Sequence, residues 1–277
     1  MQIEHFENID QYYKTVKDYL LQQEAIHCLI LGLCSRKNFK EQSYLAVVKE
    51  KNSVMVSAIR TPPYKLVLSK SLSQDAIALI AEDLVSRRES LPGVIAPQSE
   101  ALAFAKVWQS LTGQSYPLGL AQRIYQLEVV KPIDTANGYL RLATKSDRSL
   151  LTNWIQAFSE EAIGDNEPEP NYQELCDRRL SLNSLYIWQD NIPVSMAGIS
   201  GATPNGIRIN AVYTPPEYRR KGYASTCVAA LSQTLLDKGN RYCFLFTNLA
   251  NPTSNSIYQK IGYQPVCDVG NYRFENR

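Results

Sequence analysis

Several features that would assign a function at once are missing from this sequence of 277 residues. None of its six cysteines form the C-x-x-C spacing of zinc and redox centres, a pattern that favours packed thiols in a reducing compartment. There is no G-x-x-x-x-G-K-S/T motif, and Lys221 and Gly222 stand in the reverse order, so a P-loop nucleotide site is not indicated. Histidine occurs only at His5 and His27, which leaves the second half without a histidine to act as a base.

An excess of charge and a long apolar run are also missing. Lysine and arginine number 29 against 27 acidic residues, a net charge of +2 that argues against general nucleic-acid binding. The first residues have neither the basic start nor the apolar run of a signal peptide, and the apolar stretch 28–33 is too short to span a bilayer. We therefore expect a cytoplasmic protein that does not bind membranes.

The most informative stretch, residues 207–236, combines a strand, a basic turn and a helix. Apolar and polar residues alternate over 207–213, and Pro215 and Pro216 then end the strand because proline lacks an amide donor. Apolar residues at helical spacing follow Gly222. The start of a helix carries unpaired amides and a partial positive charge, and residues 219–221 add three cations. This combination predicts a seat for a pyrophosphate, the alternative being an ordinary solvated basic turn.

Hydrophobic periodicity predicts the same succession of elements in both halves of the chain. The expected helices cover residues 9–26, 73–88, 99–111, 150–158 (with Ser146 as its cap), the stretch after 222, and 252–261. The expected strands cover residues 44–49, 53–59, 65–68, 92–96, 121–130, 139–143, 185–189, 193–198, 207–213, 241–247 and 266–274.

This repeated order suggests two copies of one α/β fold. We place the join near 132–137, which gives domains at 1–131 and 138–277. The segment of the first half that corresponds to the basic turn is 69–72, which has no glycine and one cation. If the copies are real, the first has lost its anion seat.

Two segments resemble the GNAT N-acetyltransferase superfamily. Residues 219–224, RRKGYA, resemble its R/Q-x-x-G-x-G/A signature, with Ala224 in place of the last glycine. Residues 248–263 resemble its second conserved region, N-x-x-(A/S)-x-x-x-Y-x-K-x-G-F/Y. The resemblance covers residues from about 139 to 277 well and the first half only through element order. The whole is similar to tandem-GNAT proteins with a degenerate N-terminal copy.

The resemblance implies a fold, a cosubstrate and a site. The fold class would be α/β (α+β), with two GNAT-like domains, each a mixed, mostly antiparallel sheet flanked by helices, and a splayed strand pair in the C-terminal copy. Acetyl-coenzyme A would be the cosubstrate, with its pyrophosphate on the loop amides, its thioester carbonyl on an amide of 211–214, and Tyr258 passing a proton to the departing thiolate. The implied acetyl-CoA-binding residues are Ala211, Val212, Tyr213, Thr214, Arg219, Arg220, Lys221, Gly222, Tyr223, Ala224, Asn248, Asn251, Asn255 and Tyr258.

Part of this site also follows from the residues alone. Asn251 precedes Pro252 and is a good helix cap, and Asn251, Asn255 and Tyr258 have spacings that place them on one helix face. If that face lines a cleft, two amides and a phenol point at one ligand. The alternative is that Asn251 only caps the helix and Tyr258 only packs against neighbours.

The attacking amine must be neutral, so the acceptor decides how strong a base is needed. A lysine-like amine costs about 4 to 5 kcal/mol to deprotonate at neutral pH, against about 1 for an α-amine. Without a histidine, the base must be a carboxylate or water held by one. Glu160 and Glu161 are the first choices as catalytic residues, although such acids can equally form a solvated face. The same region also contains Asp165, Glu167, Glu169 and Glu174.

These expectations converge on an N-acetyltransferase that acts on an amine acceptor, either a small molecule or a peptide. The first half would shape the acceptor groove or a homodimer contact. One alternative is a non-catalytic acyl-CoA sensor or interaction module, which keeps the pyrophosphate seat and lacks a base. Another is an aminoacyl- or peptidyl-transferase with an RNA-linked donor, which the near-neutral charge disfavours.

Overall fold

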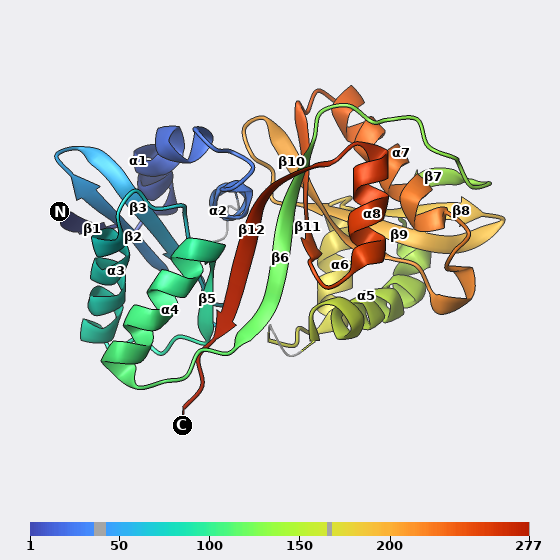
Figure 1. Cartoon of the computed structure of the whole chain (residues 1–277). Coiled ribbons are helices and arrows are strands. Elements are labelled where there is room, and N and C mark those ends of the chain that lie inside the picture. Colours follow the sequence, from blue (N-terminus) through green and yellow to red (C-terminus); the bar gives the residue numbers. More distant parts are fainter. Residues whose placement is uncertain (36–42, 165–167, 277) are drawn as a thin grey trace. The chain divides into compact units, whose positions relative to one another are not determined.

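A computed structural model describes residues 1–35, 43–164 and 168–276 (Figure 1). The chain forms two compact units. Unit 1 comprises Met1–Ile124 and Val266–Arg277, and unit 2 comprises Tyr125–Pro265. None of the helices in these described ranges is both long and apolar enough to cross a membrane.

The first half of the chain alternates strands and helices. Its elements are β1 (Gln2–His5), α1 (Ile9–Leu21), α2 (Cys28–Cys34), β2 (Tyr44–Glu50), β3 (Ser53–Arg60), β4 (Leu66–Leu68), α3 (Gln74–Ser86), β5 (Gly93–Pro97), α4 (Gln98–Thr112) and β6 (Leu118–Leu127). Strands β1 to β4 pair antiparallel in sequence order, and β4 pairs parallel with β5.

The second half repeats this order. Its elements are β7 (Tyr139–Leu142), η1 (Lys145–Asp147), α5 (Arg148–Ala162), α6 (Tyr172–Ser181), β8 (Leu185–Asp190), β9 (Ile192–Ser200), β10 (Gly206–Tyr213), η3 (Pro216–Tyr218), α7 (Tyr223–Asp237), β11 (Tyr242–Asn248), α8 (Pro252–Ile261) and β12 (Gln264–Arg273). Strands β7 to β10 pair antiparallel in order, and β10 pairs parallel with β11. The succession of elements therefore matches the first half, as the predicted repeat requires, and the sense of these pairings matches as well. The pairing within each unit is mostly antiparallel, as the resemblance implies.

The last strand of the chain pairs differently from what its position in the sequence suggests. β12 pairs antiparallel with β5, with Val269 opposite Pro97 and Arg273 opposite Gly93 (Figure 1). Its end packs into the core of unit 1, where Phe274 stacks on Trp108 at 5.5 Å between ring centroids. Residues 266–277 thus belong to unit 1, although the element order suggests the second half. A strand pairs with whichever sheet edge is open to it. The local pattern of apolar and polar residues does not show which edge that is.

Two further local expectations need correction. Helix α5 begins at Arg148 after a capping box in which Thr144 and Asp147 bond each other's backbone amides, so Ser146 is not its cap. Helix α6, which the periodicity did not predict, covers Tyr172–Ser181 and is capped by Asn171. The helix is mostly polar and Cys176 is its one buried residue, so it has too few apolar residues at helical spacing to be predicted from the sequence.

The sheet of unit 2 has an apolar core on each face. Ile209 of β10 packs in the cluster formed with α7 and α8, together with Val228 and Ile261. Ala211 and Tyr213 instead pack in the cluster that contains Trp154 of α5. Strand β10 is therefore buried on both faces. The loop that follows it begins at a buried strand end, between the two clusters of unit 2.

Candidate functional site

Strand β10 is interrupted at the end that leads into the basic turn. Asn210 lies opposite Gly198 of β9, whereas Tyr213 lies opposite Met196, so two residues of β10 face one of β9. Ala211 within this bulge has a φ of 48°, which is uncommon for a residue other than glycine. The parallel register with β11 covers only 206–208 against 242–244. The sheet is thus paired at the start of β10 and splayed at its end, as the resemblance implies.

The turn after β10 presents a run of unpaired backbone amides. Arg220 and Gly222 have φ values of 61° and 82°, and Gly222 is the N-cap of α7 without a side-chain hydrogen bond to the helix. The amide of Arg219 donates to Pro216 O, and that of Thr226 donates to Gly222 O. Between them, the six amides of residues 220–225 donate to no other group in the described part of the chain. Residues 219–222 are exposed, so these donors are open to an anion.

Gly222 lies where an added side chain would meet little resistance. A Cβ built there would have only the Ala136 side chain within 4 Å, at 3.7 Å. The backbone amide of Ala136 donates to Thr226 Oγ1 at 3.0 Å, and Thr226 is 3 % exposed. The linker between the halves is therefore attached to the first turn of α7, beside the open amides.

The three cations of the turn have different surroundings. Arg219 donates from Nε to Thr214 O at 2.9 Å, and its guanidinium lies 5.8 Å from the Tyr213 ring centroid. Lys221 Nζ lies 5.8 Å from the Tyr218 ring centroid. Arg220 is exposed, and its side chain contacts no charged group among the residues described. Arg219 is thus held against the end of β10, and Arg220 and Lys221 point their charge to solvent.

Of the acidic candidates that the structure describes, only Glu161 contacts this turn. Both Glu161 carboxylate oxygens accept hydrogen bonds from Arg219 Nη2, at 2.8 and 2.7 Å. Glu160, one residue earlier on α5, accepts a hydrogen bond from Gln156 Nε2 at 3.0 Å. Glu174 accepts from Asn171 Nδ2 at the start of α6, and Glu169 is exposed. Asp165 and Glu167 lie outside the described residues.

Three asparagines, Asn248 at the end of β11, Asn251 and Asn255, hold the local backbone. Asn248 Oδ1 accepts from the Ala250 amide at 2.8 Å, and Asn251 Oδ1 caps α8 by accepting from the Ser254 amide at 3.0 Å. Asn255 Nδ2 donates to the carbonyls of both Asn248 and Asn251, at 3.0 and 2.7 Å. Asn255 Oδ1 accepts from the Tyr125 hydroxyl at 3.0 Å. The side chains of all three are thus engaged in shaping the segment that follows the splayed strand.

Tyr258 lies on the buried face of α8. Its side chain is 8 % exposed and contacts Tyr125 and Tyr263, with ring centroids 6.4 and 5.9 Å away. Burial raises the pKa of Tyr258 to about 12. The Tyr258 hydroxyl makes no hydrogen bond with another described residue, in contrast to Tyr125 and Tyr263, which both bond neighbours. It therefore remains a protonated donor available to a ligand at neutral pH.

Two residues that sequence reasoning missed hold the site in place. Ser195 of β9, 0 % exposed, donates to Tyr213 O at 3.1 Å and bonds Thr214 Oγ1 at 2.8 Å, which anchors the end of β10. A serine inside the apolar run of β9 is a signal that could have pointed to it. Asp190 accepts a hydrogen bond from the Tyr223 hydroxyl at 2.6 Å. An aspartate at a hairpin turn is ordinary, so no sequence signal marks this contact.

In unit 1 the corresponding turn, residues 69–73, has no open amides among its five. These amides donate in order to Ser57 O (3.0 Å), His27 Nε2 (3.1 Å), Glu100 Oε1 (3.2 Å), Met55 O (2.9 Å) and Ser71 Oγ (3.2 Å). Glu100 and His27 are both buried and occupy donors of the kind left open in unit 2. The turn in unit 1 is therefore saturated by the protein's own groups.

The geometry of the chain is that of the GNAT fold. The model of the family described as "FR47-like protein" matches residues 193–272, which include β10, the basic turn and α8. No curated protein matches the sequence.

Solved structures resemble the chain over nearly its whole length. A GNAT-family acetyltransferase from Colwellia psychrerythraea is 12% identical, with a TM-score of 0.61 over 99% of this chain and 100% of that one. A GCN5-related N-acetyltransferase from Sphaerobacter thermophilus is 11% identical, with a TM-score of 0.64 over 98% and 95%. A tandem GNAT protein from the clavulanic acid biosynthesis pathway is 11% identical, with a TM-score of 0.54 over 98% and 97%. These likenesses confirm the predicted GNAT fold.

Proposed function

We propose that this chain of GNAT fold is an N-acetyltransferase that transfers an acetyl group from acetyl-CoA to an amine, with the reaction in unit 2. The observation that carries this proposal is the run of six open amides at residues 220–225, beside the exposed Arg220 and Lys221. Amides at the start of a helix bind phosphate oxygens without any side-chain acid or base. The turn of unit 1 supports the assignment to unit 2, because the amides of residues 69–73 there all donate to the protein's own groups.

The splayed end of β10 supports a place for the thioester. β10 and β11 stop pairing after Arg208 and Phe244, so backbone donors near 211–214 are not committed to the parallel ladder. An extended pantetheine arm can use such donors as an added strand would. One of these amides would hold the carbonyl oxygen as negative charge develops on it. Ser195 would keep this segment rigid through Tyr213 and Thr214.

The chemistry is a direct attack. The neutral amine nitrogen adds to the thioester carbonyl carbon, the new C–N bond replaces the C–S bond, and coenzyme A leaves as a thiolate. The proton lost by the amine passes to a carboxylate or to water, and the thiolate gains one from solvent. Glu161 is the carboxylate we propose for this, because it alone of the described acidic candidates contacts the basic turn.

The pKa of Tyr258 limits its role. A pKa of about 12 against about 8.5 for a thiol makes complete proton transfer to the thiolate uphill by about 5 kcal/mol. Tyr258 is therefore better suited to stabilise the thiolate by donating a hydrogen bond than to give up its proton. The asparagines at 248, 251 and 255 would act by shaping the cleft wall, since their side chains bond the local backbone and Tyr125.

One observation favours a second candidate, a non-catalytic acyl-CoA sensor. Glu161 is already engaged by Arg219, and a base that must break an ion pair is a poor one. Calorimetric titration with acetyl-CoA, followed by a screen of amines for release of the free thiol, tests both. Binding with amine-dependent thiol release supports the transferase, and binding without release from any amine class supports the sensor. If acetyl-CoA does not bind, both are wrong.

A further inference from the structure

Tyr223, the first residue of α7, ties the open amides to a distant part of unit 2. Its hydroxyl donates to Asp190 Oδ2 at 2.6 Å, and Asp190 is the last residue of β8, at the tip of the β8–β9 hairpin. No other side chain of residues 220–225 forms a hydrogen bond within the described structure. Gly222 and Arg220 lie just before Tyr223 with positive φ, and little packs against Gly222. The Tyr223–Asp190 bond is therefore the main side-chain restraint on the direction of these amides.

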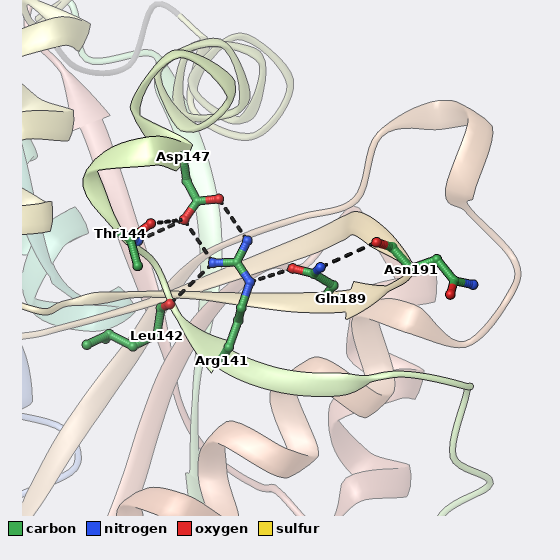
Figure 2. Close-up of polar contacts among 6 residues, drawn as sticks. All are labelled: Arg141, Leu142, Thr144, Asp147, Gln189 and Asn191. Carbon is green, nitrogen blue, oxygen red and sulfur yellow. Dashed lines mark hydrogen bonds and ion pairs between the residues drawn. The ribbon is translucent and has the colours of Figure 1, made fainter.

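The residues on either side of Asp190, Gln189 and Asn191, belong to a chain of polar contacts that Figure 2 shows. Arg141 of β7 binds both carboxylate oxygens of Asp147, at 2.8 and 2.7 Å, and donates from Nε to Gln189 Oε1 at 2.5 Å (Figure 2). Gln189 Nε2 donates to Asn191 O at 3.3 Å, across the turn that contains Asp190. The bonds from Arg141 and Thr144 lower the pKa of Asp147 to about 2, so this carboxylate stays charged. The hairpin tip is thus attached to the capping box that begins α5.

We infer that Asp190 is a positioning residue for acetyl-CoA, which acts through the Tyr223 hydroxyl to hold the amides of 220–225 in the orientation that binds the diphosphate. This inference rests on the proposed function. A seat whose donors are fixed before the ligand arrives loses less conformational entropy on binding. The hydrogen bond to Asp190 also raises the pKa of Tyr223, which keeps the phenol protonated as the donor.

The test compares acetyl-CoA with S-acetylpantetheine, which lacks the diphosphate. A positioning role predicts a loss for acetyl-CoA alone, whereas a general effect on the cleft predicts a loss for both. In Asp190→Ala and Tyr223→Phe we expect the Kd and KM for acetyl-CoA to rise roughly tenfold, with kcat unchanged. The double variant should be no worse than either single variant, because both remove the same bond. Turnover of S-acetylpantetheine should be unaffected. Asp190→Asn, which keeps an oxygen acceptor, should recover most of the loss.

Matched controls are Tyr139→Phe and Asp237→Asn, an exposed tyrosine and an acid at the other end of α7. Both should bind acetyl-CoA as the wild type does, and circular dichroism melts should show all variants folded. Equal acetyl-CoA affinity in Asp190→Ala and the wild type would overturn the inference and leave the proposed function standing. Equal losses for acetyl-CoA and S-acetylpantetheine would also overturn it. A wild-type protein that binds no acetyl-CoA would overturn the proposed function itself, and the inference with it.

Discussion

Glu161 and Arg219, 58 residues apart in sequence, form an ion pair in which one guanidinium nitrogen bonds both carboxylate oxygens, at 2.8 and 2.7 Å. The pair joins the last turn of α5 to the basic turn, and Arg219 also binds Thr214 O at the end of β10. A candidate base, a candidate acetyl-CoA loop and the splayed strand are thus in one contact network. Both side chains are nearly half exposed, at 49 % and 42 %, so the pair adds little stability.

Glu161→Gln tests this acid as the base. An exposed pair is worth about 0.2 to 1 kcal/mol, so the melting temperature should hardly change. Loss of a general base should lower kcat about 10²- to 10⁴-fold, most strongly for lysine-like amines. Steady-state kinetics with one lysine-like and one α-amine acceptor measure this. Glu160→Gln is the control, since Glu160 contacts Gln156 and not the turn. Equal losses in the two variants would argue against Glu161.

Gly222→Asp tests the turn as the diphosphate site. Either Asp or Ala at this φ of 82° is strained by about 1 kcal/mol, and neither Cβ meets a clash, since Ala136 lies 3.7 Å away. The carboxylate of Asp adds repulsion of the diphosphate, so we expect Kd for acetyl-CoA to rise on the order of 100-fold, against less than tenfold for Gly222→Ala. Calorimetry gives both values. Similar affinities for the two variants would show that the turn does not contact the diphosphate.

Tyr258→Phe tests the phenol as a donor to the thiolate. We expect kcat to fall about tenfold with Kd for acetyl-CoA unchanged, because one hydrogen bond to a charged group is lost. Because burial raises the pKa of Tyr258 to about 12, the phenol stays protonated up to about pH 11, and its ionisation should not limit the rate below that pH. A wild-type rate that falls near pH 10, with the fall missing in Tyr258→Phe, would contradict this.

The folding stability of unit 1 should depend on pH because of His27. Its Nδ1 bonds Leu20 O at 2.9 Å and its Nε2 bonds the Lys70 amide at 3.1 Å, so the neutral ring donates from Nδ1 and accepts at Nε2. Burial lowers the pKa of His27, so the unfolded chain binds this proton more tightly than the folded one. Its contribution to stability is complete above the unfolded pKa of about 6.5 and is lost as pH falls through the folded pKa.

Thermal melts between pH 7.5 and 5 measure this contribution, and the wild-type melting temperature should fall toward pH 5. The variant His27→Gln should be less stable at pH 7.5 and show a smaller fall. An equal fall in both proteins would mean that another group is responsible.

One acetyl-CoA should bind per chain. In unit 1 the amides of 69–73 all donate to the protein's own groups, with Glu100 and His27 among the acceptors. A diphosphate would have to displace buried partners there, whereas in unit 2 it meets open donors. Calorimetric stoichiometry decides this, and Gly222→Asp should weaken the single binding event on the order of 100-fold. A second equivalent that persists in Gly222→Asp would place a site in unit 1.

Local chemistry explains why much of the fold could be predicted. Pro215 and Pro216 end β10, Gly222 supplies the left-handed cap of α7, and α8 covers Pro252–Ile261 as expected because Asn251 and Pro252 start it. The predicted repeat of elements is also present. The polar helix α6 was missed because it has only a weak apolar stripe, and its one buried residue is Cys176.

Less of the candidate site could be predicted from local sequence. Asn251 caps α8 as predicted, but the partner of Asn255 Oδ1 is the Tyr125 hydroxyl, 130 residues away in sequence. The spacing of acids could not separate Glu160 from Glu161, since adjacent residues on a helix point about 100° apart and only one reaches Arg219.

The sequence by itself determined the strand, turn and helix around residues 207–236, because backbone torsions and the period of burial are set by near neighbours. The tertiary structure alone decided that β12 pairs with β5, that Glu161 meets Arg219, and that Tyr223 reaches Asp190. These contacts join residues far apart in the chain. They depend on sheet register and helix packing, which no short segment specifies.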